Sequence, residues 1–211
     1  MNNIERRFFT TTLTPDEARQ AEDGKMIFGG IASSVNEPYT LYEDDTYAFI
    51  EVIAPGAFRE AAKWDVRVLL NHDPNFILGR TAAGTAKIEE RANGLYYEWD
   101  NDEAISYAAD LARSIKRGDI TQSSFAFAMG DFEERYYDED GKKKVKRTIL
   151  NFRQIYDVSP VTYPANQNTS VNKRDLEAAF ERAAVELYER KQDRKTIIHM
   201  GIAINQKAMT I

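Results

Sequence analysis

Short apolar segments separated by turn-forming residues make up most of the first hundred positions. Segments 26–34 and 46–53 are rich in β-branched and aromatic residues, and asparagine and proline lie close to their ends. Similar segments follow as far as residue 100, and the dipeptide Asn93-Gly94 between two of them favours a two-residue hairpin turn. This pattern predicts β-strands connected by tight turns.

Two later segments change to the helical period. In 102–117, apolar residues recur every three or four positions, with Asn101 or Asp102 available as the N-terminal cap and Gly118 as the stop. In 173–192, a narrower apolar seam runs between charged residues. Such a seam fits docking or self-association, and it fits equally a terminal helix that lies on its own chain.

Strand patterns return in segments 119–137 and 143–165, which the turn sequence DEDGKKK joins. Taken together, the elements predict an α+β fold, mainly an antiparallel β-barrel with surrounding helices. A chain of 211 residues is long enough for one sizeable core. We therefore expect a barrel domain over residues 1–170, an amphipathic C-terminal helix over 171–195, and a tail over 196–211 to which we assign no role.

The chain contains no cysteine, which excludes disulfides, thiolate metal sites and cysteine nucleophiles, so covalent chemistry has to use an oxygen or a lysine. The net charge of -6 argues against general nucleic-acid binding, and we interpret the basic run Lys142–Arg147 as a solvated hairpin. No apolar run approaches the roughly 20 residues that span a bilayer. The N-terminus lacks the apolar core of a signal peptide, so we expect a cytoplasmic protein without a membrane partner.

The segment QSSFAF places two hydroxyls in an otherwise apolar strand. Side chains alternate between the two faces of a strand, so Ser123, Phe125 and Phe127 share one face and Ser124 lies on the other, among small residues. We therefore predict that Ser124 is the more accessible hydroxyl. A serine in a strand is weak evidence by itself, because it usually bonds its neighbours and because a nucleophile needs a base.

The chain has two histidines that could act as that base. His199 lies in the unpatterned tail, whereas His72 ends a predicted strand beside a loop, where catalytic groups are often presented. Asp157 lies in an apolar strand, where a histidine partner would offset the cost of burying its charge. Other interpretations stay open: a turn role for His72, an exposed strand edge for Asp157, and Asp73 as the orienting carboxylate.

Three of these segments, VLLNHDPNFILGRT, QSSFAF and YDVSPVTYPAN, occur in an order and spacing that resemble the prohead or capsid-maturation proteases of tailed bacteriophages. These are serine peptidases whose fold is similar to that of the herpesvirus assemblins. The resemblance implies that Ser124 is the nucleophile, His72 the base and Asp157 the third member. Many relatives have glutamate where this chain has Asp157. The arginine pair of the assemblins is missing, so backbone amides or Arg153 would have to serve the oxyanion.

The resemblance also implies partners and a location. The substrates would be the scaffolding region of the major capsid protein and the protease itself, cut inside the procapsid in the host cytoplasm. No cofactor or metal is expected, and the 173–192 helix is a candidate element for packaging or formation of a homo-oligomer. The alternatives are a non-catalytic capsid assembly or scaffolding protein and a barrel that binds peptides by strand addition. A hydrolase of another class is disfavoured because the G-x-S-x-G motif is absent.

Overall fold

The computed structural model describes residues 4–9, 13, 19–20, 26–163, 178–182, 185 and 189. Most of them lie in β-strands. The strands are β1 (Glu5–Phe9), β2 (Arg19–Gln20), β3 (Met26–Ser34), β4 (Tyr39–Glu43), β5 (Tyr47–Ile53), β6 (Arg67–Leu70), β7 (Asp73–Arg80), β8 (Ala86–Arg91), β9 (Gly94–Asn101), β10 (Gln122–Met129), β11 (Phe132–Glu139), β12 (Lys142–Ile149) and β13 (Phe152–Val161). The helices are α1 (Ser106–Arg117) and the 3-10 helices η2 (Ala61–Lys63) and η3 (Thr81–Ala83), and residues 178–182 are also helical.

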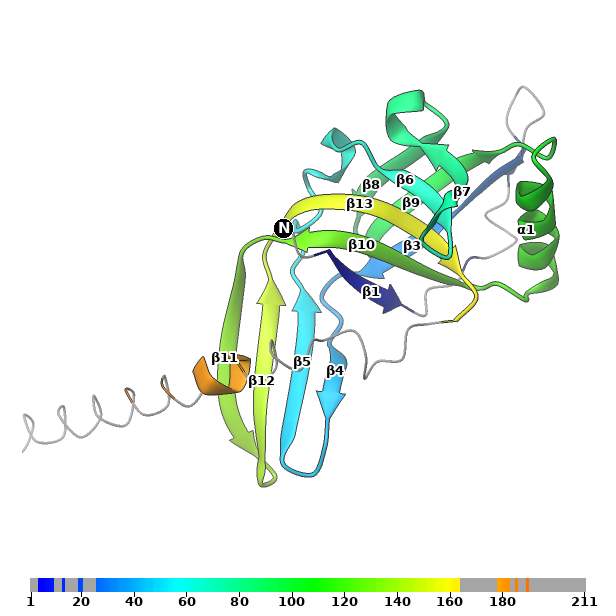
Figure 1. Cartoon of the computed structure of the whole chain (residues 1–211). Helices are drawn as coiled ribbons and strands as arrows, with labels where there is room; N and C mark the ends of the chain where they lie inside the picture. The colour runs from blue at the N-terminus through cyan, green and yellow to red at the C-terminus, as the bar shows by residue number, and fades with distance from the viewer. Residues whose placement is uncertain are drawn as a thin grey trace, which may run out of the picture.

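The described strands form three sheets (Figure 1). Five strands pair in the order β1-β10-β13-β6-β7, four in the order β11-β12-β5-β4, and four in the order β2-β3-β9-β8. The β11-β12-β5-β4 sheet extends away from the other two, and α1 lies at the opposite end of the body (Figure 1). The prediction of a mainly β fold with few helices is confirmed, and the barrel stays a prediction, because the described strands pair in three separate sheets.

Most strand pairs are antiparallel, as expected, but two are not. Strand β12 pairs with β5, and β13 pairs with β6, in the parallel direction. Each parallel pair joins segments that are far apart in the sequence, so neither pairing follows from a local hydrophobic pattern. The second of them brings the end of β6 beside β13.

The chain leaves the five-stranded sheet after β10 and returns to it at the start of β13. At this crossing, the Asn151 side chain accepts a hydrogen bond from the Asp131 N–H at 3.0 Å and donates one to the Asp131 carboxylate at 2.8 Å. A Cβ at Gly130 would come within 2.0 Å of Asn151 Oδ1. Gly130 therefore permits the close approach that keeps β10 and β13 side by side.

Both predicted hairpins form. Asp140 and Gly141 connect β11 to β12, with φ angles of 53° and 77°, the left-handed pair that a tight hairpin favours. The other hairpin, between β8 and β9, turns one residue earlier than the sequence suggests. Its turn residues are Ala92 and Asn93, and Gly94 already begins β9.

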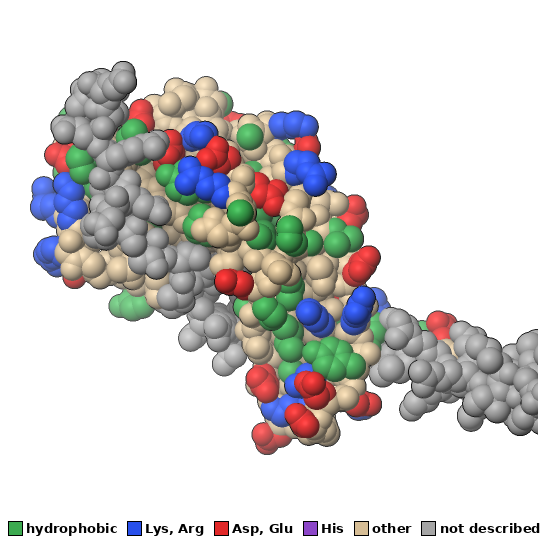
Figure 2. All heavy atoms as spheres, turned by 180° about the vertical axis from the view of Figure 1, so that it is seen from behind, with side chains coloured by type: hydrophobic (Ala, Val, Ile, Leu, Met, Phe, Trp, Pro, Cys, Tyr) green, Lys and Arg blue, Asp and Glu red, His purple; other side chains and the backbone are tan. Residues whose placement is uncertain are grey.

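The basic run on β12 is less solvated than expected. Lys142 bonds to Glu43 at 2.7 Å and Lys144 to Glu139 at 2.6 Å. Arg147, which is 7% exposed, bonds to Glu134 at 2.8 Å. Acidic side chains are prominent at the free end of this sheet (Figure 2). Three basic side chains of the run are therefore paired with carboxylates on β4 and β11.

Helix α1 begins at Ser106, four residues later than predicted, and the predicted apolar stripe forms its buried face. Asp102 does not cap the helix but accepts a hydrogen bond from the Ala104 N–H at 2.9 Å in the preceding turn. Gly118 ends the helix in the left-handed conformation, with φ of 80°, as predicted. The buried residues of the helix are Ala108, Leu111, Ala112 and Ile115.

Most of the predicted C-terminal helix, and all of the tail 196–211, lie outside the described residues. Within 178–182, Ala179 is fully buried and the Phe180 ring lies 4.5 Å from the Tyr47 ring on β5. Arg182 donates hydrogen bonds to Glu134 on β11. This part fits the interpretation of a terminal helix that lies on its own chain.

The inner face of β10 is fixed by a cluster of aromatic rings. Phe125 and Phe127 are fully buried, as predicted, with their ring centres 4.9 Å apart. Phe152, at the start of β13, packs edge-on against both rings, and Phe58 stacks on Phe152 at 4.8 Å. Aromatic pairs at these distances stabilise a core beyond the area they bury. The cluster holds β10 in one register, so the opposite face of the strand is presented at a fixed place.

Candidate active site

Three strands of the five-stranded sheet carry the candidate residues. Ser124 on β10 lies directly opposite Ser159 on β13, and Asp157 lies opposite Ala126 on the same pair of strands. The parallel neighbour β6 places Arg67 beside Asp157 and then runs toward the Ser159 end of β13. Non-local strand pairing therefore brings together residues from three distant parts of the sequence.

His72 lies in the turn between β6 and β7, not at the end of a strand as predicted. Leu70 pairs with Asp73, so Asn71 and His72 are the two turn residues, with φ angles of 55° and 59°. Left-handed backbone is uncommon for non-glycine residues, and strain of this kind clusters at functional sites. The Asn71 side chain holds the turn on the end of β13: its amide donates to Thr162 Oγ1 at 3.1 Å, and its oxygen accepts from the Thr162 N–H at 2.8 Å.

The structure brings the three predicted residues into one chain of hydrogen bonds. His72 Nδ1 lies 2.5 Å from Asp157 Oδ1, and His72 Nε2 lies 2.6 Å from Ser124 Oγ. With a proton on Nδ1 donated to the carboxylate, Nε2 can accept the hydroxyl proton. This is the order of contacts by which a base activates a hydroxyl nucleophile.

Asp157 does not lie at an exposed strand edge. Strand β13 is paired on both sides, by β10 and β6, and Asp157 is only 7% exposed. A buried carboxylate is costly unless it is hydrogen-bonded, and here His72 and Ser159 provide the partners. The rival carboxylate, Asp73, instead accepts hydrogen bonds from Asn75 in the following turn.

Ser159 is a site residue that the sequence reasoning missed. Its hydroxyl donates to Asp157 Oδ1 at 3.0 Å and accepts from the His72 backbone N–H at 3.3 Å. The same oxygen lies 3.3 Å from His72 Nδ1. Ser159 thus contacts both the carboxylate and the histidine turn. The signal that could have found it is its spacing, because a residue two positions after Asp157 on a strand lies on the same face.

The two adjacent serines point to opposite sides of β10, as predicted. Ser123 faces the core, where its hydroxyl lies 2.9 Å from the Tyr97 hydroxyl. The prediction that Ser124 is the more accessible of the two is wrong, because both residues are 0% exposed. Strand β1 lies beside β10 and pairs Phe8 with Ser124. The Ser124 hydroxyl, 2.9 Å from the Arg7 carbonyl oxygen, is covered by this strand.

Arg153 lies too far from Ser124 to serve an oxyanion. Ser124 is opposite Ser159, and Arg153 is six residues earlier on β13, which at about 3.3 Å per strand residue is about 20 Å. Backbone amides and Arg153 were the two candidate donors of hydrogen bonds to the oxyanion, and only backbone amides are compatible with this geometry. The other histidine, His199, lies outside the described residues.

In the part of the chain that the structure describes, no group of three or more histidine, aspartate or glutamate side chains is arranged to hold a metal ion. Over the same residues, no helix combines the length and the apolar character needed to cross a membrane.

Comparison with known proteins finds a matching protein family. The family model described as caudovirus prohead serine protease matches residues 14–182. A solved structure, the capsid assembly protease gp21 of bacteriophage T4, is 13% identical over 77% of this chain and 98% of that chain, with a TM-score of 0.45. That likeness is too distant to support an argument about this fold or its mechanism. No curated protein matches the chain.

Proposed function

Because the chain belongs to the caudovirus prohead serine protease family, we propose that it is a serine endopeptidase of capsid maturation that acts through Ser124, His72 and Asp157. The observation that carries this proposal is the His72 ring, which is hydrogen-bonded to Ser124 on one side and to Asp157 on the other. A scaffold without catalysis has no need for these three side chains to meet.

In the proposed reaction, Ser124 Oγ attacks the carbonyl carbon of a peptide bond while His72 Nε2 takes its proton. The C–N bond then breaks, His72 returns the proton to the leaving amine, and the acyl group stays on Ser124. Water attacks this ester with His72 again as base, which releases the second product and restores the hydroxyl. Throughout, Asp157 holds Nδ1–H and stabilises the imidazolium that forms at each step.

For substrates, we propose the scaffolding region of the major capsid protein and the protease chain itself. Family membership supports this choice, since a prohead protease acts on the shell that surrounds it. Cleavage inside the procapsid, in the host cytoplasm, would remove scaffolding segments irreversibly. Activity before the shell closes would destroy the scaffold early, so the enzyme benefits from being held inactive until then.

The test is co-expression of the chain with the capsid protein of its phage, followed by intact-mass measurement of every product. We compare the wild type with Ser124→Ala, and use Ser123→Ala as the matched control because it removes the adjacent hydroxyl, which bonds Tyr97 in the core. We expect cleavage with the wild type and the control, and none with Ser124→Ala.

Cleavage that persists in Ser124→Ala would exclude Ser124 as the nucleophile. If the folded wild type cleaves neither protein and does not react with a serine-directed phosphonate, the alternative of a non-catalytic assembly protein becomes the better account. Circular dichroism of each variant shows whether a loss of cleavage is a loss of folding.

A further inference from the structure

Strand β1 occupies the edge of the sheet directly beside the candidate nucleophile. It pairs antiparallel with β10 from Glu5 opposite Phe127 to Phe9 opposite Ser123. An extended peptide that adds to a sheet edge binds in the same way, through its backbone, with side chains entering pockets on alternate sides. This strand precedes residues 14–182, which match the family model. The chain's own N-terminal segment thus holds the place that a substrate strand beside Ser124 would need.

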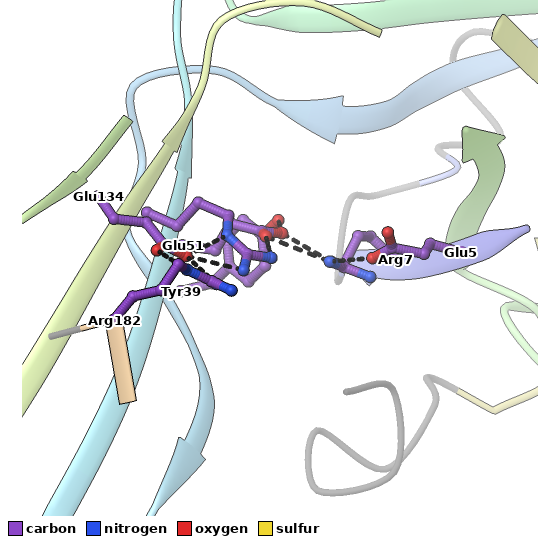
Figure 3. A network of polar contacts seen from close by, with 7 residues as sticks. Glu5, Arg7, Tyr39, Glu51, Glu134 and Arg182 are labelled. Atoms are coloured by element: carbon purple, nitrogen blue, oxygen red, sulfur yellow. Dashed lines mark hydrogen bonds and ion pairs between the residues drawn. The ribbon is translucent and has the colours of Figure 1, made fainter. Parts of the chain in front are cut away.

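The side chain of Arg7 fills a pocket between two sheets (Figure 3). It is 2% exposed, and its guanidinium donates to both oxygens of Glu51, at 2.6 Å from Nε and 3.1 Å from Nη2. The Tyr39 hydroxyl donates to the same carboxylate, and the Phe127 ring lies 5.2 Å from the guanidinium carbon. A two-point contact with a carboxylate and an aromatic face are features that recognise arginine.

Glu51 is 0% exposed, and a buried carboxylate without a cation beside it is strongly destabilising. Burial by itself lowers the pKa of Arg7, but the charge of Glu51 and the hydrogen bond to it outweigh burial, and the pKa of Arg7 is raised. Arg147 lies farther from Glu51, at 3.7 Å, and is bonded to Glu134 at 2.8 Å. Without Arg7, the pocket would favour another basic side chain.

The pocket and the nucleophile both contact Arg7. The carbonyl oxygen that accepts the Ser124 hydrogen bond belongs to Arg7, whose side chain lies against Glu51. We propose that Glu51, with Tyr39 and Phe127, forms the pocket that selects a basic side chain immediately before the bond to be cut, and that Arg7 occupies it in this structure. The inference rests on the proposed protease function and adds the residue that determines its specificity.

The occupied state is closed and unreactive. Ser124 has one hydroxyl proton, and when the proton is donated to the Arg7 carbonyl oxygen it is not held by His72 Nε2. Ser124 is also 0% exposed, so β1 has to leave before another peptide can reach it. A cavity of about 290 Å³, lined by Glu5, Ala128, Gly130 and others, lies at the start of β1 and continues its path along β10. Substrate residues before the basic one would lie in this cavity.

The experiment measures cleavage by the full chain of peptides that differ only in the residue before the scissile bond: arginine, lysine, glutamine or glutamate. We expect the wild type to cut the arginine peptide at least tenfold faster than the glutamine peptide. Glu51→Gln should reduce that ratio at least tenfold. A wild-type enzyme without preference for a basic residue, or a folded Glu51→Gln with an unchanged ratio, overturns the proposal.

A second variant keeps the proposal testable if Glu51→Gln does not fold. Arg7→Gln removes the occupant, and Arg147 remains near Glu51, so we expect a folded chain whose Ser124 reacts with a phosphonate at least fivefold faster. Arg6→Gln removes the same charge from the neighbouring residue and should leave the labelling rate unchanged. Equal labelling of the wild type and Arg7→Gln would show that β1 does not guard the site.

Different results would contradict the protease function and the pocket assignment. If no folded variant is labelled and no peptide is cut, the protease function itself fails. If Ser124 is labelled and peptides are cut without regard to a basic residue, the protease stands and the pocket assignment fails. Labelling that appears only in Arg7→Gln supports the protease function and the closed state, and the peptide series then decides the pocket assignment.

Discussion

Asp157 determines which nitrogen of His72 carries the proton. Its Oδ1 lies 2.5 Å from Nδ1, so the carboxylate accepts a hydrogen bond from Nδ1–H, and Nε2 can accept one from Ser124 Oγ at 2.6 Å. Ser159 donates a second hydrogen bond to the same Asp157 oxygen, which keeps the carboxylate in place. The proposed chemistry therefore depends on an acceptor at residue 157 and not only on its size or polarity.

Asp157→Asn tests this dependence. The new amide can donate to Nδ1, which moves the ring proton to Nε2 and leaves Ser124 without an acceptor. We expect kcat to fall about 10³- to 10⁴-fold with the fold retained, the loss seen when a triad carboxylate becomes an amide. Asp73→Asn is the control, since Asp73 bonds only to Asn75 in the hydrogen bonds described above. A fall of less than tenfold in Asp157→Asn would contradict the assigned role.

Among the elements, the turn between β6 and β7 is the one that places His72. Both of its residues have left-handed backbone, and the Asn71 side chain fastens the turn to Thr162 by two hydrogen bonds. The Asn71 N–H also donates to the Pro160 carbonyl at 3.1 Å. Backbone conformation and side-chain contacts therefore contribute separately to the position of the histidine.

Two substitutions separate these contributions. Asn71→Gly keeps the left-handed backbone conformation accessible but removes the two side-chain hydrogen bonds. This loss should lower the free energy of unfolding by about 1–3 kcal/mol. Asn71→Ala should lower the free energy of unfolding by about 1–2 kcal/mol more, because alanine disfavours left-handed backbone. We expect both substitutions to lower kcat, and the alanine substitution to lower it more strongly.

Asn36, with φ of 60° in another turn, is the control: Asn36→Ala should reduce stability in denaturant unfolding without changing kcat. Equal stability of the Asn71→Gly and Asn71→Ala variants would contradict the backbone argument.

The local elements near the site were largely predictable, and their pairing was not. Alternation along β10 correctly placed Phe125 and Phe127 in the core and Ser124 on the other face, because period-two patterns depend on neighbouring residues only. The exposure of Ser124 was predicted wrongly because it depends on β1, which pairs across more than a hundred residues. The contact of Ser159 with the His72 turn depends on the parallel pairing of β6 and β13, which leaves no local signal, whereas its contact with Asp157 follows from their spacing on one strand.

Across the whole molecule, one network of charges connects β1, the β11-β12-β5-β4 sheet and the C-terminal helical segment (Figure 3). Arg7 on β1 bonds to Glu51 on β5, and Arg147 on β12 lies between Glu51 and Glu134. Glu134 on β11 accepts hydrogen bonds from Arg182 of the C-terminal helical segment. The strand that covers Ser124 is thus linked to the C-terminal helical segment on another sheet, through ion pairs that are buried except at Arg182, which is half exposed.

Glu134 makes part of this link dependent on pH. Burial alone raises the pKa of Glu134, but hydrogen bonds from Arg182, Tyr136 and Arg147 outweigh it, and the pKa is lowered from 4.5. A carboxylate with a lowered folded-state pKa stabilises the fold above its unfolded-state pKa, and this stabilisation is lost as the pH falls through the folded-state value. We expect Glu134→Gln to unfold at lower denaturant concentration than the wild type at pH 7. The difference should shrink steadily below about pH 4.5. Glu133→Gln, the same change on an exposed neighbour, should show no such convergence, and a wild-type advantage that persists unchanged at pH 3 would exclude this role for Glu134.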